Sequence, residues 1–464
     1  MTNNRLRTFG VLAYLLVLAS CSDEAAPTQP GLDASRHFVM PSDTHRAIMP
    51  TRRVVPQTMP VDLRTGSASM QTGGIWYHGG PILEQTKVVA IYWAATPIYA
   101  NGPTPGTTGS GAQDGSLIGY FLNHLGGSNY FGINTTYYDA VHPVQNVVTY
   151  TGFWANNQNV PASNGSEVSD GTIRAMITSG LQSGSLAYDP QTVYVVFGAG
   201  RTNLGGGFTG ANGYCGYHGN FQPSGFPTVT YAVLPYDAYY YSICTNGTPY
   251  PNGDPADAEV NTLAHEVEEV TTDFLLNAWF GSDTKHENAD LCAWNFGQGA
   301  GATYSNGTGT ANIRLGSRDF LVQTNWANRD DGGCFFGLNH AGLYVTALSG
   351  VPQPVRIPGS YTAAIGGTSV SPRGSTWYKW EVSYSNGVLP PVITPYQGSS
   401  YSLNVPAGSY TIYVTVTPRD YEGVGYPTAW TYSVCTAEGA AAKSISPDAV
   451  GGCAPPPDPL AATR

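Results

Sequence analysis

The spacing of apolar residues changes near residue 340, and the change divides the chain into two kinds of fold. Residues 74–338 combine continuous strand-like runs, such as Val88–Trp93 and Thr192–Phe197, with two or three helical stretches. This combination predicts an α/β or α+β main domain. Residues 340–436 alternate between apolar and polar, most clearly over residues 410–416. Alternation interrupted by turn residues is typical of antiparallel strands, so we expect an all-β, immunoglobulin-like sandwich there.

The N-terminus has the pattern of a secretory signal peptide over residues 1–20, because two arginines precede the apolar run Val11–Leu18. The segment that ends in Cys21 resembles the lipobox of bacterial lipoproteins, in which this cysteine carries the lipid. The resemblance implies an exported lipoprotein. Ser22, in place of an acid, favours the outer membrane or the cell surface, facing the periplasm or the exterior. The alternative is an ordinary signal peptide with a chance cysteine.

Two further segments lack sustained apolar periodicity. Residues 21–73 are rich in Pro, Thr, Ser and Ala, which predicts a flexible tether between the lipid and the main domain. The Pro-rich tail, residues 437–464, is expected to be mostly disordered. No stretch after the signal peptide is apolar over the roughly 20 residues that a spanning helix needs, so membrane contact is expected through the lipid alone.

The charge balance limits the classes of partner. Lys and Arg total 20 against 31 Asp and Glu, which gives a formal charge of -11 without any basic run. Such a surface does not neutralise phosphates, so nucleic acid is excluded as a partner. An extracellular polypeptide or a cell-wall glycan fits better, because the many glycines and tyrosines predict a surface of amides, hydroxyls and phenols.

The cysteines predict disulfide bonds. If Cys21 carries a lipid, the other six of the seven cysteines can pair completely, as expected of an exported chain. A zinc–thiolate site needs close C-x-x-C pairs, and the sequence has none. Many pairings are possible. Pairing neighbours in chain order gives Cys215 with Cys244, Cys292 with Cys334, and Cys435 with Cys453.

A long helix in the main domain is predicted to start at Asp254-Pro255, because the acid can cap the helix and the proline fits its first turn. It is expected to run to about Trp279. An apolar stripe at helical spacing predicts the face that packs on the core; it comprises Val260, Leu263, Ala264, Val267, Val270, Phe274 and Ala278.

The opposite face of this helix carries ligand-type side chains. His265, Glu269 and Asp273 are spaced by four and stack along one side, with Glu266 beside them. The run from His265 to Glu269 reads H-E-x-x-E, one letter from the H-E-x-x-H motif of zincins. That motif predicts zinc ligands at His265 and Glu269, with Glu266 as the catalytic base. Two carboxylates would weaken the ion as a Lewis acid, so calcium is an alternative, and a solvated acidic helix face is another.

A loop downstream supplies a third ligand. Glu287 lies 22 positions after His265, in the range where zincins of this type place a glutamate. We therefore expect Glu287 to bind the metal, with Asp290 as an alternative ligand or a partner that orients His265. A disulfide at Cys292 would hold the loop in place. His218 is a candidate donor that stabilises the transition state.

These motifs resemble the EXORDIUM, or phosphate-induced protein 1, family of secreted plant and bacterial proteins. The resemblance covers roughly residues 74–338 and rests on the H-E-x-x-E helix and on the run Glu287–Cys292, with supporting pieces near Trp76, Tyr214 and Phe320. It implies secretion more firmly than any reaction, because the family has no agreed chemical activity. Five residues match the family pattern, whereas Asp273 stands in place of an asparagine and is less favoured as a ligand; the matching residues are His265, Glu266, Glu269, Glu287 and Asp290.

Two functions follow. The first is a zincin-like, zinc-dependent peptidase or amide hydrolase that works outside the cytoplasm. The second is a non-catalytic extracellular protein that binds glycan or protein, in which the H-E-x-x-E site is metal-free or structural.

Overall fold

The computed structural model describes residues 46–50, 74–205, 214–239, 244–245, 247–281, 286–329 and 332–435. The expected signal peptide, Cys21, Cys453 and the C-terminal tail lie outside these ranges. The described residues are largely β structure in several sheets. Among them, no helix is both long enough and apolar enough to cross a membrane.

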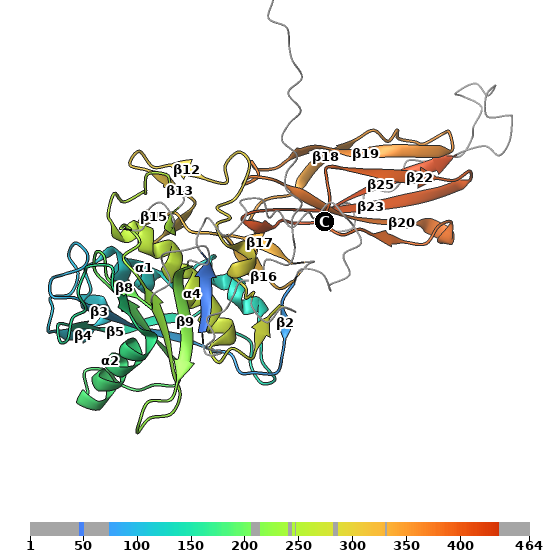
Figure 1. Cartoon of the computed structure of the whole chain (residues 1–464). Coiled ribbons are helices and arrows are strands. Elements are labelled where there is room, and N and C mark those ends of the chain that lie inside the picture. The colour runs from blue at the N-terminus through green and yellow to red at the C-terminus, as the bar shows by residue number, and fades with distance from the viewer. Residues whose placement is uncertain are drawn as a thin grey trace, which may run out of the picture. The chain divides into compact units, whose positions relative to one another are not determined.

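The main domain is built on a seven-stranded mixed sheet in the order β1-β9-β10-β7-β3-β5-β4 (Figure 1). Its four inner strands, β10, β7, β3 and β5, are parallel. The pairs β1–β9, β9–β10 and β4–β5 are antiparallel. The strands span Arg46–Pro50 (β1), Thr86–Trp93 (β3), Thr108–Ser110 (β4), Val148–Asn156 (β5), Thr192–Phe197 (β7), Tyr214–Phe221 (β9) and Val229–Leu234 (β10).

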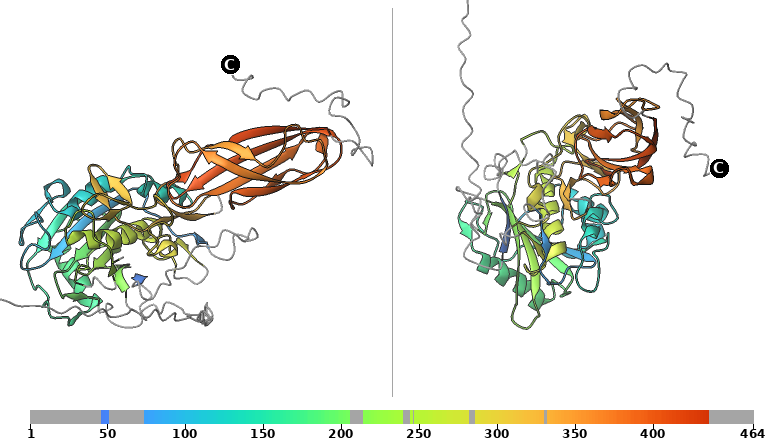
Figure 2. Two further views of the ribbon diagram at one scale, coloured as in Figure 1. Left: turned by 90° about the horizontal axis from the view of Figure 1, so that it is seen from above. Right: turned by 90° about the vertical axis from the view of Figure 1, so that its right-hand side faces the viewer.

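Helices cover both faces of this sheet (Figure 2). On one face, α1 (Leu117–Leu125) and α4 (Ala256–Asp273) pack on the inner strands around Val88 and Val195. On the other face lies α2 (Asp170–Ser183). The parallel strands are buried on both faces, which explains their unbroken apolar sequences.

Short elements complete the main domain. Two-stranded sheets join β2 to β11, β6 to β8, β12 to β13, β14 to β15, and β16 to β17. Their strands are Trp76–Tyr77 (β2), Glu167–Val168 (β6), Asn203–Leu204 (β8), Trp279–Phe280 (β11), Tyr304–Ser305 (β12), Thr310–Ala311 (β13), Ile313–Leu315 (β14), Arg318–Phe320 (β15), Asn325–Ala327 (β16) and Gly333–Phe335 (β17). The 3-10 helices are Gly111–Gln113 (η1), Phe131–Thr136 (η2) and Asp290–Cys292 (η3).

The C-terminal part forms two antiparallel sheets that share one apolar core, as the alternating sequence predicts. One sheet has the order β18-β19-β22, and the other joins β21, β20, β23, β24 and β25. Trp380 and Val414 from one sheet meet Leu403 and Val405 from the other in this core. The elements are Val345–Ser349 (β18), Gly359–Thr368 (β19), Trp377–Tyr384 (β20), Ser385–Gly387 (η4), Val392–Ile393 (β21), Ser400–Val405 (β22), Ser409–Asp420 (β23), Gly423–Val424 (β24) and Thr428–Cys435 (β25).

The predicted disulfides Cys215–Cys244 and Cys292–Cys334 are both present. Cys435 is also disulfide-bonded. Its expected partner, Cys453, lies outside the described residues.

Two expectations from the sequence were wrong in detail. The predicted tether contains a strand, because residues 46–50 pair with β9 as β1 and bury Ala47 and Met49. The long helix ends at Asp273 and not near Trp279. Asp273 Oδ1 accepts the backbone N–H groups of Asn277 and Ala278, at 2.6 and 2.5 Å. These bonds turn the chain out of the helix before Trp279 enters β11.

Candidate metal centre

Helix α4 positions most of the polar side chains of the site, and every residue of this helix is buried. It begins where the sequence predicts, because Asp254 Oδ1 accepts the backbone N–H of Ala256 at 2.9 Å. The apolar stripe packs on the sheet through Val260, Leu263 and Val267. The opposite, acidic face is not at the surface, so the alternative of a solvated acidic helix face was wrong. The loop that carries Glu287, together with nearby chain segments, covers it, so its carboxylates are buried and not solvated.

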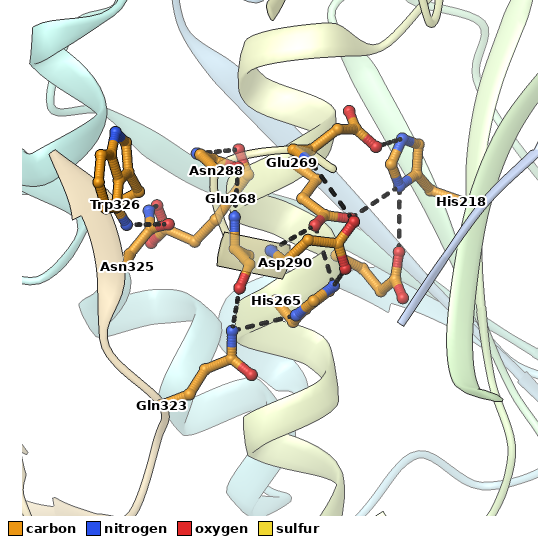
Figure 3. A network of polar contacts seen from close by, with 12 residues as sticks. His218, His265, Glu268, Glu269, Asn288, Asp290, Gln323, Asn325 and Trp326 are labelled. Atoms are coloured by element: carbon orange, nitrogen blue, oxygen red, sulfur yellow. Dashed lines mark hydrogen bonds and ion pairs between the residues drawn. The ribbon is translucent and has the colours of Figure 1, made fainter. Parts of the chain in front are cut away.

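Three of these side chains converge on one point. His265 Nε2 lies 3.0 Å from Glu269 Oε1 and 3.5 Å from Asp290 Oδ1 (Figure 3). The backbone N–H of Asp290 also donates to Glu269 Oε1, at 3.0 Å, so the loop is tied directly to the helix. From the sequence, Glu287 was the predicted third metal ligand beside His265. In the structure Asp290 takes that place, because it begins the 3-10 helix η3 and its backbone N–H is bound to Glu269.

A second imidazole approaches from the sheet. His218 lies on β9, with Nδ1 3.1 Å from Glu266 Oε2 and 3.6 Å from Glu269 Oε2. Its Nε2 lies 3.6 Å from Glu287 Oε2. The sequence proposed His218 as a donor to the substrate, but both of its ring nitrogens face carboxylates. The structure therefore places it against the expected base and not in an open oxyanion site.

A glycine allows β9 to come this close to α4. Gly216 precedes His218 by two residues, so both lie on the same face of the strand. A Cβ atom on Gly216 would lie 2.8 Å from Glu266 Oε1 and 2.6 Å from Thr262 Cγ2. Any larger residue there would push Glu266 away from its present position.

Burial and mutual repulsion perturb the acids of the site. Burial raises the pKa values of Glu266 and Glu287 well above their ordinary value, and the charges of neighbouring carboxylates add to this effect, whereas the charge of His265 opposes it at Glu266. Burial and the charge of Asp290 raise the pKa of Glu269 to about 7. Several carboxylates packed together out of water are costly unless a cation compensates their charge.

The two histidines respond in opposite directions. Burial lowers the pKa of His218 to about 3, and the charge of His265 adds to this shift. Burial alone would also lower the pKa of His265. The carboxylates of Glu269 and Asp290 overcome that effect and raise it well above its ordinary value. His265 therefore already serves as a partial counter-charge to the acids.

Many buried polar atoms of the site make no hydrogen bond of regular geometry with any other described residue, and His265 Nε2 has only its close contacts with the carboxylates of Glu269 and Asp290. Such atoms are rare in folded proteins and call for a ligand. They are His218 Nε2, His265 Nε2, Glu266 Oε1, Glu269 Oε2, both carboxylate oxygens of Glu287, and Asp290 Oδ1.

The donor set fits a divalent cation. Ligand atoms around a tetrahedral zinc ion with bonds of about 2.1 Å lie about 3.4 Å apart. One atom each from His265, Glu269 and Asp290 lie within 4.8 Å of one another, and so do one atom each from His218, Glu266 and Glu269. Zinc accepts this mixture of imidazole nitrogen and carboxylate oxygen.

One neighbour contacts the other ring nitrogen of His265. Gln323 Nε2 lies 3.1 Å from His265 Nδ1 and donates to the carbonyl of Ala289 at 2.8 Å. Gln323 therefore contacts the ring nitrogen of His265 that faces away from Glu269 and Asp290. The sequence did not single out Gln323, which only the folded chain brings to α4.

Asp273 is not part of the convergent group, because its carboxylate holds the turn after α4. A buried acid that the sequence analysis overlooked is Glu268, on another side of the helix. Its Oε2 accepts from Asn325 Nδ2 at 2.5 Å, and Asn288 Nδ2 donates to its backbone carbonyl (Figure 3). Both asparagines come from distant parts of the chain, so helical spacing could not reveal this network.

Each of the two disulfides includes a cysteine that is close in sequence to a residue of the site. Cys215 is next to Gly216 on β9, and its bond to Cys244 ties that strand down. Cys292 ends η3, and its bond to Cys334 holds the loop that contains Asp290. Such bonds are typical of proteins that fold outside the reducing cytoplasm.

Comparison with known proteins gives one distant relative. No family model matches the chain. The chain is 29% identical to EXORDIUM-like 3 of Arabidopsis thaliana over 143 residues, which covers 25% of this chain and 42% of the relative. It therefore spans less than half the length of that relative.

Solved structures resemble the chain only slightly. The fibronectin type-III domain of human fibronectin type III domain containing protein 3 is 14% identical, with a TM-score of 0.15, over 21% of this chain and 97% of that domain. The FN1–FN3 domains of chicken CNTN1 are 12% identical, with a TM-score of 0.17, over 27% of this chain and 43% of theirs. The match to EXORDIUM-like 3 links this chain distantly to the EXORDIUM-like proteins, which the motifs of its main domain resemble.

Proposed function

We propose that the main domain is a zincin-like, zinc-dependent peptidase or amide hydrolase, with the ion held by His265, Glu269 and Asp290. The observation that carries the proposal is the convergence of buried nitrogen and oxygen atoms that lack hydrogen-bond partners at the centre of the domain. The short distances from His265 Nε2 to both carboxylates support the same ligand set.

When bound, the ion would lower the pKa of a coordinated water and polarise the scissile carbonyl. Glu266 takes the proton from the attacking water and returns it to the leaving nitrogen. Its raised pKa, caused by burial, makes it a stronger base than an exposed glutamate once ionised.

His218 positions this base. Because its pKa is held at about 3, its ring stays neutral at working pH and has only one N–H group. One ring nitrogen faces Glu266 and the other faces Glu287. It can fix the orientation of the Glu266 carboxylate and pass a proton toward Glu287.

The test is metal analysis of the full chain, purified without chelators, beside substituted chains. Glu266→Gln should keep one zinc per chain and lose turnover of peptide or amide substrates, whereas His265→Ala should lose both. Asp290→Asn should lose the metal, and Glu287→Gln is the matched control that should retain it. If the wild-type chain holds no stoichiometric transition metal, the hydrolase is wrong and the non-catalytic binding protein replaces it.

We also propose that the chain is exported and anchored through lipidated Cys21. The disulfides and the secreted character of the resembled family support export. Expression in a bacterial host should place the wild-type chain in the membrane fraction and Cys21→Ala in the soluble periplasmic or extracellular fraction. Equal distribution of the two would overturn the anchor.

A further inference from the structure

Among the described residues, strand β1 is joined to the rest of the main sheet only through β9. It lies antiparallel beside β9 (Figure 1). In this pairing Ala47 is opposite His218, and Met49 is opposite Gly216. The register shifts between Met49 and Pro50, and proline has no N–H to continue the ladder. Without these five residues, β9 would be the edge strand of the sheet and would present unpaired backbone groups.

This strand lies directly against the candidate metal centre. The backbone amide of Met49 hydrogen-bonds to the Glu266 carboxylate and lowers its pKa, against the larger raising effect of burial. The Met49 side chain is fully buried and packs with the Cys215–Cys244 disulfide and Trp294. The Arg46 guanidinium lies over the ring of Tyr217, 5.1 Å from its centroid.

We propose that the edge of β9 beside His218 is the docking site for an extended polypeptide, and that residues 46–50 occupy this edge in the resting chain. The inference rests on the proposed hydrolase, because it names the substrate class of that site. An extended segment adds to a sheet edge through backbone hydrogen bonds, whatever its sequence, and side-chain pockets then select among sequences. The pocket of Met49 selects an apolar side chain, and Tyr217 selects a cation.

The complete burial of the site supports the inference that β1 must leave the edge of β9 before a substrate can enter. His218, His265, Glu266 and Glu269 are all fully inaccessible while β1 is in place. A hydrolase in this state cannot admit substrate. A tethered strand competes at an effective concentration in the millimolar range, so an added peptide binds weakly until the strand is displaced.

The test uses the full chain and a substituted chain in which the strand cannot pair. Successive backbone N–H groups of a strand point in opposite directions, so either Ala47 or Ile48 donates to β9. The double substitution Ala47→Pro/Ile48→Pro therefore removes a pairing bond whichever of them it is. Far-ultraviolet circular dichroism and thermal unfolding establish that the substituted chain is folded.

The probe is a fluorescent synthetic peptide with the sequence of residues 44–51, and its binding is followed by anisotropy in EDTA. The substituted chain should bind it at least tenfold more tightly than the wild type. A peptide with Met49→Asp, and a scrambled peptide, should bind neither chain. Equal binding by the two chains, or no binding by either, would overturn the inference.

A second substituted chain covers the case in which the prolines prevent folding. Met49→Asp in the full chain places a charge in the buried pocket and should expel the strand, with the same gain in peptide binding. Because the assay needs neither metal nor turnover, binding without hydrolysis would leave the docking site intact and refute only the hydrolase. Zinc-dependent hydrolysis without this binding would refute only the docking site.

Discussion

At the scale of single residues, the account depends on Glu269. Its two carboxylate oxygens face different imidazoles, Oε1 toward His265 and Oε2 toward His218. A buried carboxylate in that position is stable only with a positive charge beside it. In the metal-free chain part of that charge comes from protonated His265, and the ion would take over the same role.

Gly216 gives a prediction at this scale. Gly216→Ala places a Cβ 2.8 Å from Glu266 Oε1 and 2.6 Å from Thr262 Cγ2. We expect a loss of about 1–3 kcal/mol in the free energy of unfolding, as for other overpacked sites, because β9 and α4 must separate. Turnover should fall further than zinc content, because Glu266 moves while His265 and Asp290 do not. Unfolding in urea and metal analysis measure the two effects.

The comparison is Gly225→Ala, at a glycine whose added Cβ would meet no atom within 4 Å. Its positive φ of 86° adds backbone strain but leaves the site untouched. If both substitutions leave turnover equal to that of the wild type, the close packing of β9 on Glu266 has no functional role.

At the scale of secondary-structure elements, α4 carries the site, and its first turn is open to a precise test. Asp254→Ala removes the acceptor for the Ala256 N–H and should cost about 1 kcal/mol in the free energy of unfolding. Asp254→Asn keeps a side-chain oxygen and should cost much less. Chemical denaturation of the two chains checks the difference. Equal losses would show that the cap contributes nothing.

Local patterns in the sequence predicted much of this element scale. The start of α4 follows from Asp254 and Pro255, its core face follows from helical spacing, and the sandwich strands follow from alternation. The end of α4 could not be predicted, because the bonds from Asp273 to Asn277 and Ala278 compete with a helix that the apolar pattern still favours.

Local patterns in the sequence predicted less well which residues form the site. The spacing of His265, Glu266 and Glu269 identified the helix correctly. The choice between Glu287 and Asp290 depends on how one loop folds. The approach of His218 depends on the pairing of β9, about 50 residues earlier. The burial of the acidic face also could not be predicted, because the same pattern suits a solvated helix.

At the scale of the whole molecule, the buried charges predict how stability depends on pH without metal. Burial raises the folded-state pKa values of Glu266 and Glu287, and the carboxylates around His265 raise its pKa. The folded chain therefore holds protons that the unfolded chain has released. His218, whose folded pKa is about 3, opposes this trend only near pH 6.5, where the unfolded chain still releases part of a proton; above about pH 7.5 it is neutral in both states. The free energy of unfolding should therefore fall as pH rises from 6.5 to 8.5, by about 1.4 kcal/mol per pH unit for each excess proton.

Denaturation in urea with EDTA at pH 6.5, 7.5 and 8.5 measures this fall. In the same series with excess zinc, most of this fall in the free energy of unfolding should disappear, because the ion replaces the bound protons as the positive charge at the site. A metal-free chain whose stability rises over this range would show that the acids are not buried together.

The central claim is that one imidazole and two carboxylates hold a metal ion on helix α4. X-ray absorption at the zinc edge, on the full chain loaded with one equivalent of zinc, tests it most directly. The account predicts a shell of nitrogen and oxygen atoms at about 2.0–2.2 Å, with an imidazole scattering pattern that His265→Ala abolishes and with no sulfur. A shell unchanged by His265→Ala, or a chain that retains no zinc, would contradict it.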